Sequence, residues 1–221
     1  MDKKELQEDQ LVDSFAHLID FYKKNQSKII ATFSAVVVII VALVGYTNYM
    51  VSQNKEANGK LSKVLRFYNG ADYNTAIEGR NGEFEGLTKI VSDYGSTEAG
   101  QIAKIYLANS LLRTGKIDEA FDMYDDFSGN KKLFIAAAKA GKAACKEVKK
   151  EYDLAGNLYK SAFEVTENNP LNSEYLLKAG KAYLKAGKKE QAKAMFLKIK
   201  DEFAGTASFS EADRYLNGIN G

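Results

Sequence analysis

Hydrophobic and polar positions follow two patterns along this chain. Between residues 29 and 54 no charged side chain occurs, and the run IIATFSAVVVIIVALVGY is apolar on every side of a helix. After residue 84, apolar and small residues return at helical spacing, in blocks separated by short polar segments. The first pattern predicts one long apolar helix, and the second predicts a series of amphipathic helices.

The apolar run is long enough to cross a membrane. Residues 29–49 would form about 31 Å of helix, which matches a hydrocarbon core of about 30 Å. Phe21 and Tyr22 precede the run, and Tyr46 and Tyr49 follow it, as expected for an interfacial aromatic belt. The 28 residues before it are long for the start of a signal peptide, and no small-x-small cleavage site follows. We therefore predict a retained signal anchor.

The charges on either side of the run bear on its orientation. Lys23, Lys24 and Lys28 lie close to its N-terminal edge. Four cations lie within 20 residues on the other side: Lys55, Lys60, Lys63 and Arg66. The count alone does not decide, but proximity favours a cytoplasmic N-terminus, and long domains translocate largely regardless of charge.

The N-terminal tail, residues 1–28, has an apolar stripe. Leu11, Phe15, Leu18 and Tyr22 are spaced by four, three and four residues, which places them on one face of a helix. This face either lies on the membrane surface, docks on a partner or merely extends the membrane helix. His17 is the single His of the chain, and with no Cys or second His nearby we expect no metal site there.

The region after the anchor repeats itself. Residues 102–127 and residues 174–199 share small and apolar residues at matching positions, including the pairs Gly115/Gly187 and Ala120/Ala192. A second unit between them contains AGKAACK, similar to AGKAYLK in the third. We predict a helical linker or first helix over residues 50–80, then a repeat domain over residues 81–221 that ends with a closing helix at 208–219.

Packing explains the repeated residues. Small residues fall midway along each first helix and early in each second helix, with an aromatic residue four positions later: Ala108, Gly141 and Gly180; Ala120, Ala155 and Ala192; Tyr124, Tyr159 and Phe196. Small side chains allow two helices to approach closely, and the rings fill the space beyond. One helix pair cannot bury its apolar face, but stacked pairs can, so the sequence predicts an all-α solenoid.

Composition changes this picture little. The net charge is +2, so the composition does not indicate a nucleic-acid partner. The chain contains one Cys, and its single Pro is compatible with a largely helical chain. No phosphate-loop, HExxH, CxxC or GxSxG motif is present, and paired acidic residues fall on helix surfaces or turns. Cys145 is interpreted as a small core residue. We expect a protein that is not an enzyme and has no catalytic, cofactor-binding or metal-binding residues.

The repeated pattern resembles the tetratricopeptide repeat over about residues 84–206. The resemblance rests on a fixed order of residue types. The first helix carries Gly or Ala and, three positions later, an aromatic residue or Leu; a Gly stands at the turn; the second helix carries Ala and then an aromatic residue. Two features depart from the pattern: Lys104 and Leu176 stand where a Trp is typical, and the closing Pro is missing.

The whole arrangement is similar to a narrower group, the YfgM-like ancillary subunits of the SecYEG translocon. That resemblance implies a single-pass protein of the bacterial inner membrane, with a cytoplasmic N-terminus and a periplasmic repeat domain. It implies translocon subunits and periplasmic chaperones as partners. The alternatives are an assembly or stability factor of another envelope complex, and a regulator whose cytoplasmic tail binds a soluble protein.

Repeats of this family bind ligands on the surface lined by their first helices. In this chain, equivalent positions on those helices carry a series of mostly cationic residues: Asn109, Arg113, Lys139, Lys142, Lys146, Lys178, Lys181 and Lys185. Such a series is either a basic groove for an acidic or extended peptide, or simply a solvated face.

Overall fold

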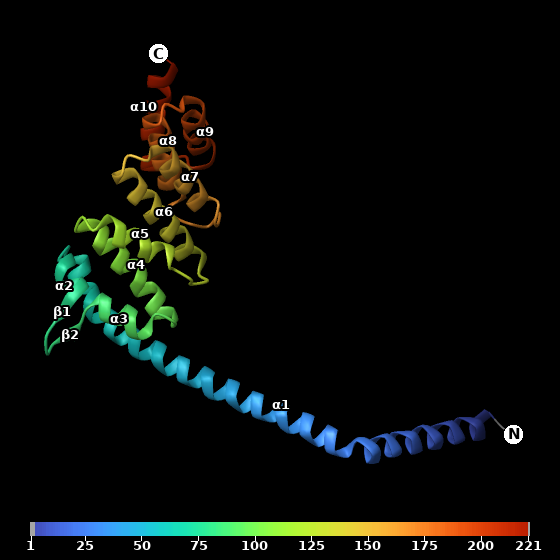
Figure 1. Ribbon diagram of the computed structural model, residues 1–221. Helices are drawn as coiled ribbons and strands as arrows, with labels where there is room; N and C mark the ends of the chain where they lie inside the picture. Colours follow the sequence, from blue (N-terminus) through green and yellow to red (C-terminus); the bar gives the residue numbers. More distant parts are fainter. Residues whose placement is uncertain (1–2, 221) are drawn as a thin grey trace. The chain divides into compact units, whose positions relative to one another are not determined.

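The computed structural model describes the backbone of residues 3–220 and the side chains of residue 13 and residues 15–219. The elements follow in the order α1 (Lys3–Asn69), α2 (Tyr73–Glu78), β1 (Gly79–Arg80), β2 (Phe84–Glu85), α3 (Leu87–Tyr94), α4 (Glu98–Arg113), α5 (Ile117–Asp125), α6 (Lys132–Val148), α7 (Tyr152–Phe163), α8 (Asn172–Lys185), α9 (Lys189–Glu202) and α10 (Ala207–Asn220). The chain divides into two compact units, residues 1–52 and residues 53–221. Figure 1 shows these elements in chain order.

The first unit consists of the N-terminal part of α1. Large apolar side chains of the predicted membrane segment are exposed on all sides, for example Phe33 at 70% and Val38 at 66%. The helix is long and apolar enough to cross a membrane, and its most apolar window buries no residue against other described parts of the chain. Of the apolar stripe predicted for the tail, Leu11 lies outside the described side chains, whereas Phe15, Leu18 and Tyr22 are exposed.

The second unit is an array of packed helices. Consecutive helices pack against one another as pairs, α4 with α5, α6 with α7 and α8 with α9, and α10 closes the array on α8 and α9 (Figure 1). The fold confirms the prediction of an all-α chain with an apolar N-terminal helix followed by packed helical hairpins.

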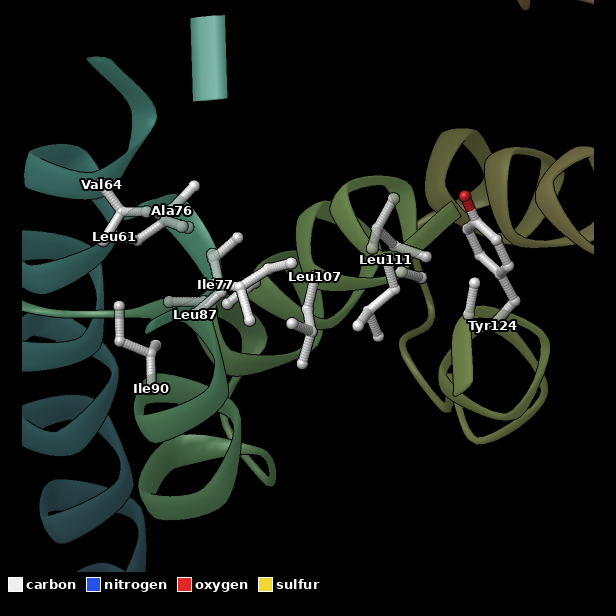
Figure 2. Close-up of a cluster of buried hydrophobic side chains, with 14 of the residues drawn as sticks. Leu61, Val64, Ala76, Ile77, Leu87, Ile90, Leu107, Leu111 and Tyr124 are labelled. Carbon is white, nitrogen blue, oxygen red and sulfur yellow. The ribbon is translucent and has the colours of Figure 1, made fainter. Parts of the chain in front are cut away.

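The C-terminal part of α1 belongs to the core of this array. Leu61 and Val64 are buried against residues of α2, α3 and α4, as Figure 2 shows. A short antiparallel hairpin of β1 and β2 follows α2, with Gly79 opposite Glu85 and Arg80 opposite Phe84. The spacing of apolar residues gave no prediction of this hairpin.

Close helix approaches depend on the predicted small residues. A Cβ atom added to Gly141 would lie 2.2 Å from the ring of Tyr124, and one added to Gly180 would lie 2.4 Å from the ring of Phe196. Both rings are buried. The aromatic residue of one helix therefore occupies the space left by the glycine of another, as the sequence pattern predicted.

Each helical hairpin turns through the same backbone motif. Gly115 and Gly187 adopt the left-handed conformation, with φ of 84° and 75°. Lys150 takes this place in the middle unit, with φ of 62°. In all three turns the next residue donates its N–H to a carbonyl five residues back, from Lys116 to Leu111 in the first case, which satisfies the last carbonyls of the helix.

Candidate partner-binding surface

The eight residues predicted to line a groove lie on three helices. Asn109 and Arg113 belong to α4, whereas α6 and α8 each carry three of the lysines. None of the eight is fully buried, so all lie at the surface of the array. Their neighbours differ from helix to helix.

Four of the lysines form ion pairs inside the molecule. Lys146 pairs with Glu151 at 2.9 Å, Lys181 with Glu211 at 3.0 Å and Lys185 with Glu147 at 2.7 Å. Lys142 pairs with Asp125 of the preceding helix α5. These carboxylates neutralise much of the positive charge that sequence spacing alone indicates. Because the pairs are partly exposed, each contributes about 0–1 kcal/mol to stability.

The remaining cations have weaker or no charged neighbours. Lys139 donates to the hydroxyl of Ser161 at 2.6 Å, and the Lys178 ammonium lies 5.9 Å from the centre of the Tyr159 ring. Arg113 is exposed at the end of α4, and no carboxylate among the described residues lies within ion-pair distance of it. Arg113 is therefore the cation of this series best placed to take an external carboxylate.

Three tyrosines lie together at α4, and the charge of Arg113 acts on one of them, Tyr68. The rings of Tyr68 and Tyr106 meet edge to face with centroids 4.7 Å apart, and the rings of Tyr68 and Tyr73 meet at 5.7 Å. Each is partly exposed. We call Tyr68, Tyr73 and Tyr106 the tyrosine cluster. Burial raises the pKa of Tyr68 by more than the hydrogen bond with Asn109 and the charge of Arg113 lower it, so the hydroxyl stays protonated at neutral pH.

Asn109 connects this cluster to the core. Its amide nitrogen donates to the Tyr68 hydroxyl at 3.1 Å, and its amide oxygen accepts from the buried hydroxyl of Tyr124. Both ends of the amide are thus engaged inside the protein. Asn109 therefore fixes the tyrosine cluster, and we do not expect it to contact a partner directly.

A second surface feature surrounds the β-hairpin. The rings of Phe67 and Phe84 stack at 4.7 Å, with the guanidinium of Arg80 5.0 Å from the Phe67 centroid. Beside them is a hollow of about 550 Å³, lined by cations and carboxylates: Lys60, Lys63, Arg80, Lys89, Glu78, Glu83 and Glu85. The Asn81–Gly82 pair was the sequence signal for the hairpin turn.

Cys145 lies in the core of the array. It is fully buried, and burial raises the pKa of its thiol to about 11. A protonated, inaccessible thiol is a poor nucleophile, so the position suits the predicted packing role. Within the described residues there is no cluster of three or more His, Cys, Asp or Glu side chains that could hold a metal ion.

Comparison with known proteins identifies part of this array. The family model described as tetratricopeptide repeat matches residues 174–206, which cover α8 and α9. No curated protein matches the chain. The chain is thus an all-α protein with one long apolar N-terminal helix and an array of helical hairpins, of which α8 and α9 form a tetratricopeptide repeat.

Proposed function

We propose that this protein is a scaffold without catalytic activity, anchored in a membrane by residues 29–49, whose helical array binds a protein partner. One observation carries the proposal. A helical-hairpin array with a tetratricopeptide repeat is joined in one chain to a helix whose apolar side chains no other described residue covers. Arrays of this kind offer extended surfaces for proteins, and an exposed apolar helix of this length suits a lipid environment.

The α4 end of the array is the best candidate for the first contact with a partner. A planar guanidinium such as that of Arg113 pairs with a carboxylate through two hydrogen bonds. Tyrosine rings beside it offer apolar area with little entropy to lose, a combination enriched at binding hot spots. An acidic or extended peptide segment fits this chemistry. The lysines of α6 and α8 would continue the surface, but a ligand there competes with the internal carboxylates.

The similarity of the arrangement to YfgM-like proteins suggests which partners to test. We propose translocon subunits and periplasmic chaperones, with the N-terminus in the cytoplasm of a bacterium and the array in the periplasm. The second candidate is an assembly or stability factor of another cell-envelope complex. The same surface would serve it, and only the identity of the captured partner separates the two.

Site-specific photocrosslinking in native membranes tests the scaffold. A photoreactive amino acid replaces Tyr106, and a matched chain carries it at Arg214 on α10. We expect translocon subunits or chaperones to be captured from position 106, with capture lost in an Arg113→Glu background and kept with Arg214→Glu. Capture of another envelope complex supports the second candidate. Equal capture from both positions, or no capture, contradicts binding at the α4 end.

Orientation needs a separate test. A reporter enzyme that folds only outside the cytoplasm is fused after Gly221, and a second chain carries a reporter that works only in the cytoplasm. We expect activity of the first and silence of the second. The reverse result would place the array in the cytoplasm and exclude periplasmic chaperones as partners.

A further inference from the structure

The N-terminal tail carries an apolar face that nothing in the described structure covers. Phe15, Leu18, Ile19 and Tyr22 share one side of α1, and their exposed fractions are 63%, 63%, 53% and 47%. The opposite side of the same turns is polar and also exposed, with Asp13, His17, Asp20 and Lys24. A helix of this kind in water would expose four large apolar side chains, an arrangement typical of a covered surface.

This face continues into the predicted membrane segment. Leu18 and Tyr22 are followed by Ile29 and Phe33 after seven and four residues, so all four lie along the same side of the helix. A shallow hollow on the neighbouring stripe of the helix, lined by polar and apolar residues, includes Ile29 and Phe33 of this side. The tail therefore extends the apolar surface that faces lipid in the proposed anchor.

The junction between tail and anchor contains a cause of helix bending. The side-chain amide of Asn25 donates to the carbonyl of Phe21 at 3.0 Å. A side chain that bonds to the carbonyl four residues back competes with the backbone N–H for this acceptor, and such competition bends helices. The polar residues 25–28 thus allow the tail to change direction where it leaves the apolar segment.

The charges at this junction favour an anionic surface. Lys23 lies at the edge of the apolar face, and Lys24 and Lys28 lie on the polar side of the helix, within two turns of Lys23. Aromatic rings at the same level, Phe21 and Tyr22, suit the boundary between headgroups and acyl chains. Basic residues beside an exposed apolar helix face are the chemistry of helices that bind in the plane of anionic membranes.

We propose that residues 15–24 lie in the headgroup region of an anionic lipid bilayer, with Phe15, Leu18, Ile19 and Tyr22 directed into the acyl chains. This inference rests on the proposed membrane anchor, since the bilayer is brought to the tail by residues 29–49. The tail then acts as an in-plane helix on the side of the membrane where the chain begins.

Single tryptophans test the proposal, because the chain contains none. The full-length F15W chain is placed in phosphatidylglycerol-containing liposomes with brominated acyl chains, which quench only fluorophores that touch them. We expect blue-shifted emission and loss of most of the intensity. H17W, on the opposite face, is the matched control and should emit as in water with little quenching. V38W reports on the anchor and should be strongly quenched.

The outcomes separate the two proposals. If V38W is quenched and F15W is not, the tail does not enter lipid and the anchor stands. If F15W emits in the blue but escapes quenching, a second copy or another protein covers the face, and the inference is wrong. If V38W is unquenched, the proposed anchor itself fails. Unchanged F15W quenching in neutral liposomes would contradict the role of the three lysines.

Discussion

At the C-terminal end of α4, Asn109 is held by hydrogen bonds to neutral side chains, whereas the equivalent positions of α6 and α8 are held in ion pairs. Asn109 joins the hydroxyls of Tyr68 and Tyr124, and Arg113 has no carboxylate beside it. Lys181 and Lys185, at the positions equivalent to Asn109 and Arg113, pair with Glu211 and Glu147. Equivalent positions of a repeat can thus carry different chemistry on the same backbone.

The difference shows how a repeat array can become selective. Helix packing is set by small residues and rings that recur from unit to unit, such as Gly180 beneath Phe196. The surface positions do not share this constraint and vary freely. Among the described residues, Arg113 at one end has no carboxylate partner, whereas Lys181 and Lys185 at the other end are paired within the protein.

The largest expected effect comes from the shared packing. In Gly180→Val the new side chain starts 2.4 Å from the buried ring of Phe196, which has no space to move into. We expect the free energy of unfolding to fall by about 3 kcal/mol. Denaturant unfolding of the full chain in detergent, followed by circular dichroism, measures this change.

Gly187→Ala is the control. Open space surrounds Gly187, so only its φ of 75° opposes a side chain, and the free energy of unfolding should fall by about 1 kcal/mol. If the two variants lost the same free energy of unfolding, close packing of the ring on the glycine would not be what holds the repeated helices together.

The next effect is specific to the α4 end. Asn109→Leu removes the acceptor of the buried Tyr124 hydroxyl and the donor to Tyr68, which should cost about 1–3 kcal/mol in the free energy of unfolding. In a Tyr124→Phe background no buried hydroxyl is left unpaired, so the same substitution should cost less. A double-mutant cycle measures this coupling. Additive losses would mean that Asn109 acts only through its contact with Tyr68.

A gain in stability is expected at the middle turn. Lys150 adopts the left-handed conformation that glycines occupy in the other two turns. Lys150→Gly should therefore raise the free energy of unfolding by about 0.5–1 kcal/mol. Lys149 has a φ of −75°, which any residue adopts, so Lys149→Gly should not raise the free energy of unfolding. Thermal unfolding of the two variants measures the difference. A loss on Lys150→Gly would show that its side chain contributes more than its backbone conformation costs.

The smallest effect concerns an ion pair of the α8 end. Lys185→Met keeps most of the apolar stem but removes the pair with Glu147, whose side chain is 29% exposed. We expect the free energy of unfolding to change by less than about 1 kcal/mol, and the change to shrink as salt is added. A loss larger than that of Asn109→Leu would reverse the comparison between the two ends.

Sequence patterns predict the packing of this fold well and its polar contacts poorly. The glycines at 141 and 180, the rings at 124 and 196 and the closing helix could be read because each follows from local spacing. The ion pairs between helices could not, because they join residues distant along the chain. Lys185 and Glu147 are 38 residues apart, and no spacing rule predicts which lysine meets which carboxylate.

Two further features of the array were not predicted from the sequence. The hairpin of β1 and β2 has strands of two residues each, too short for an alternating pattern to be seen. The positive φ of Lys150 could not be predicted, because lysine has no preference for the left-handed conformation. Only the Asn81–Gly82 turn could have indicated the hairpin, whereas at Lys150 the helix-ending turn imposes a conformation that the residue does not favour.

The closing helix α10 has a consequence for the behaviour of the molecule in a crowded compartment. Tyr215 stacks on Phe196 at 5.1 Å and covers the last apolar surface, while Asp213, Arg214 and Asn217 face solvent. An array of hairpins whose last aromatic rings were exposed to solvent would present an apolar surface to which a second copy could bind end to end. Because the outer face of α10 is polar, we expect this end of the array not to attract the apolar surface of a second copy, even when copies are crowded together.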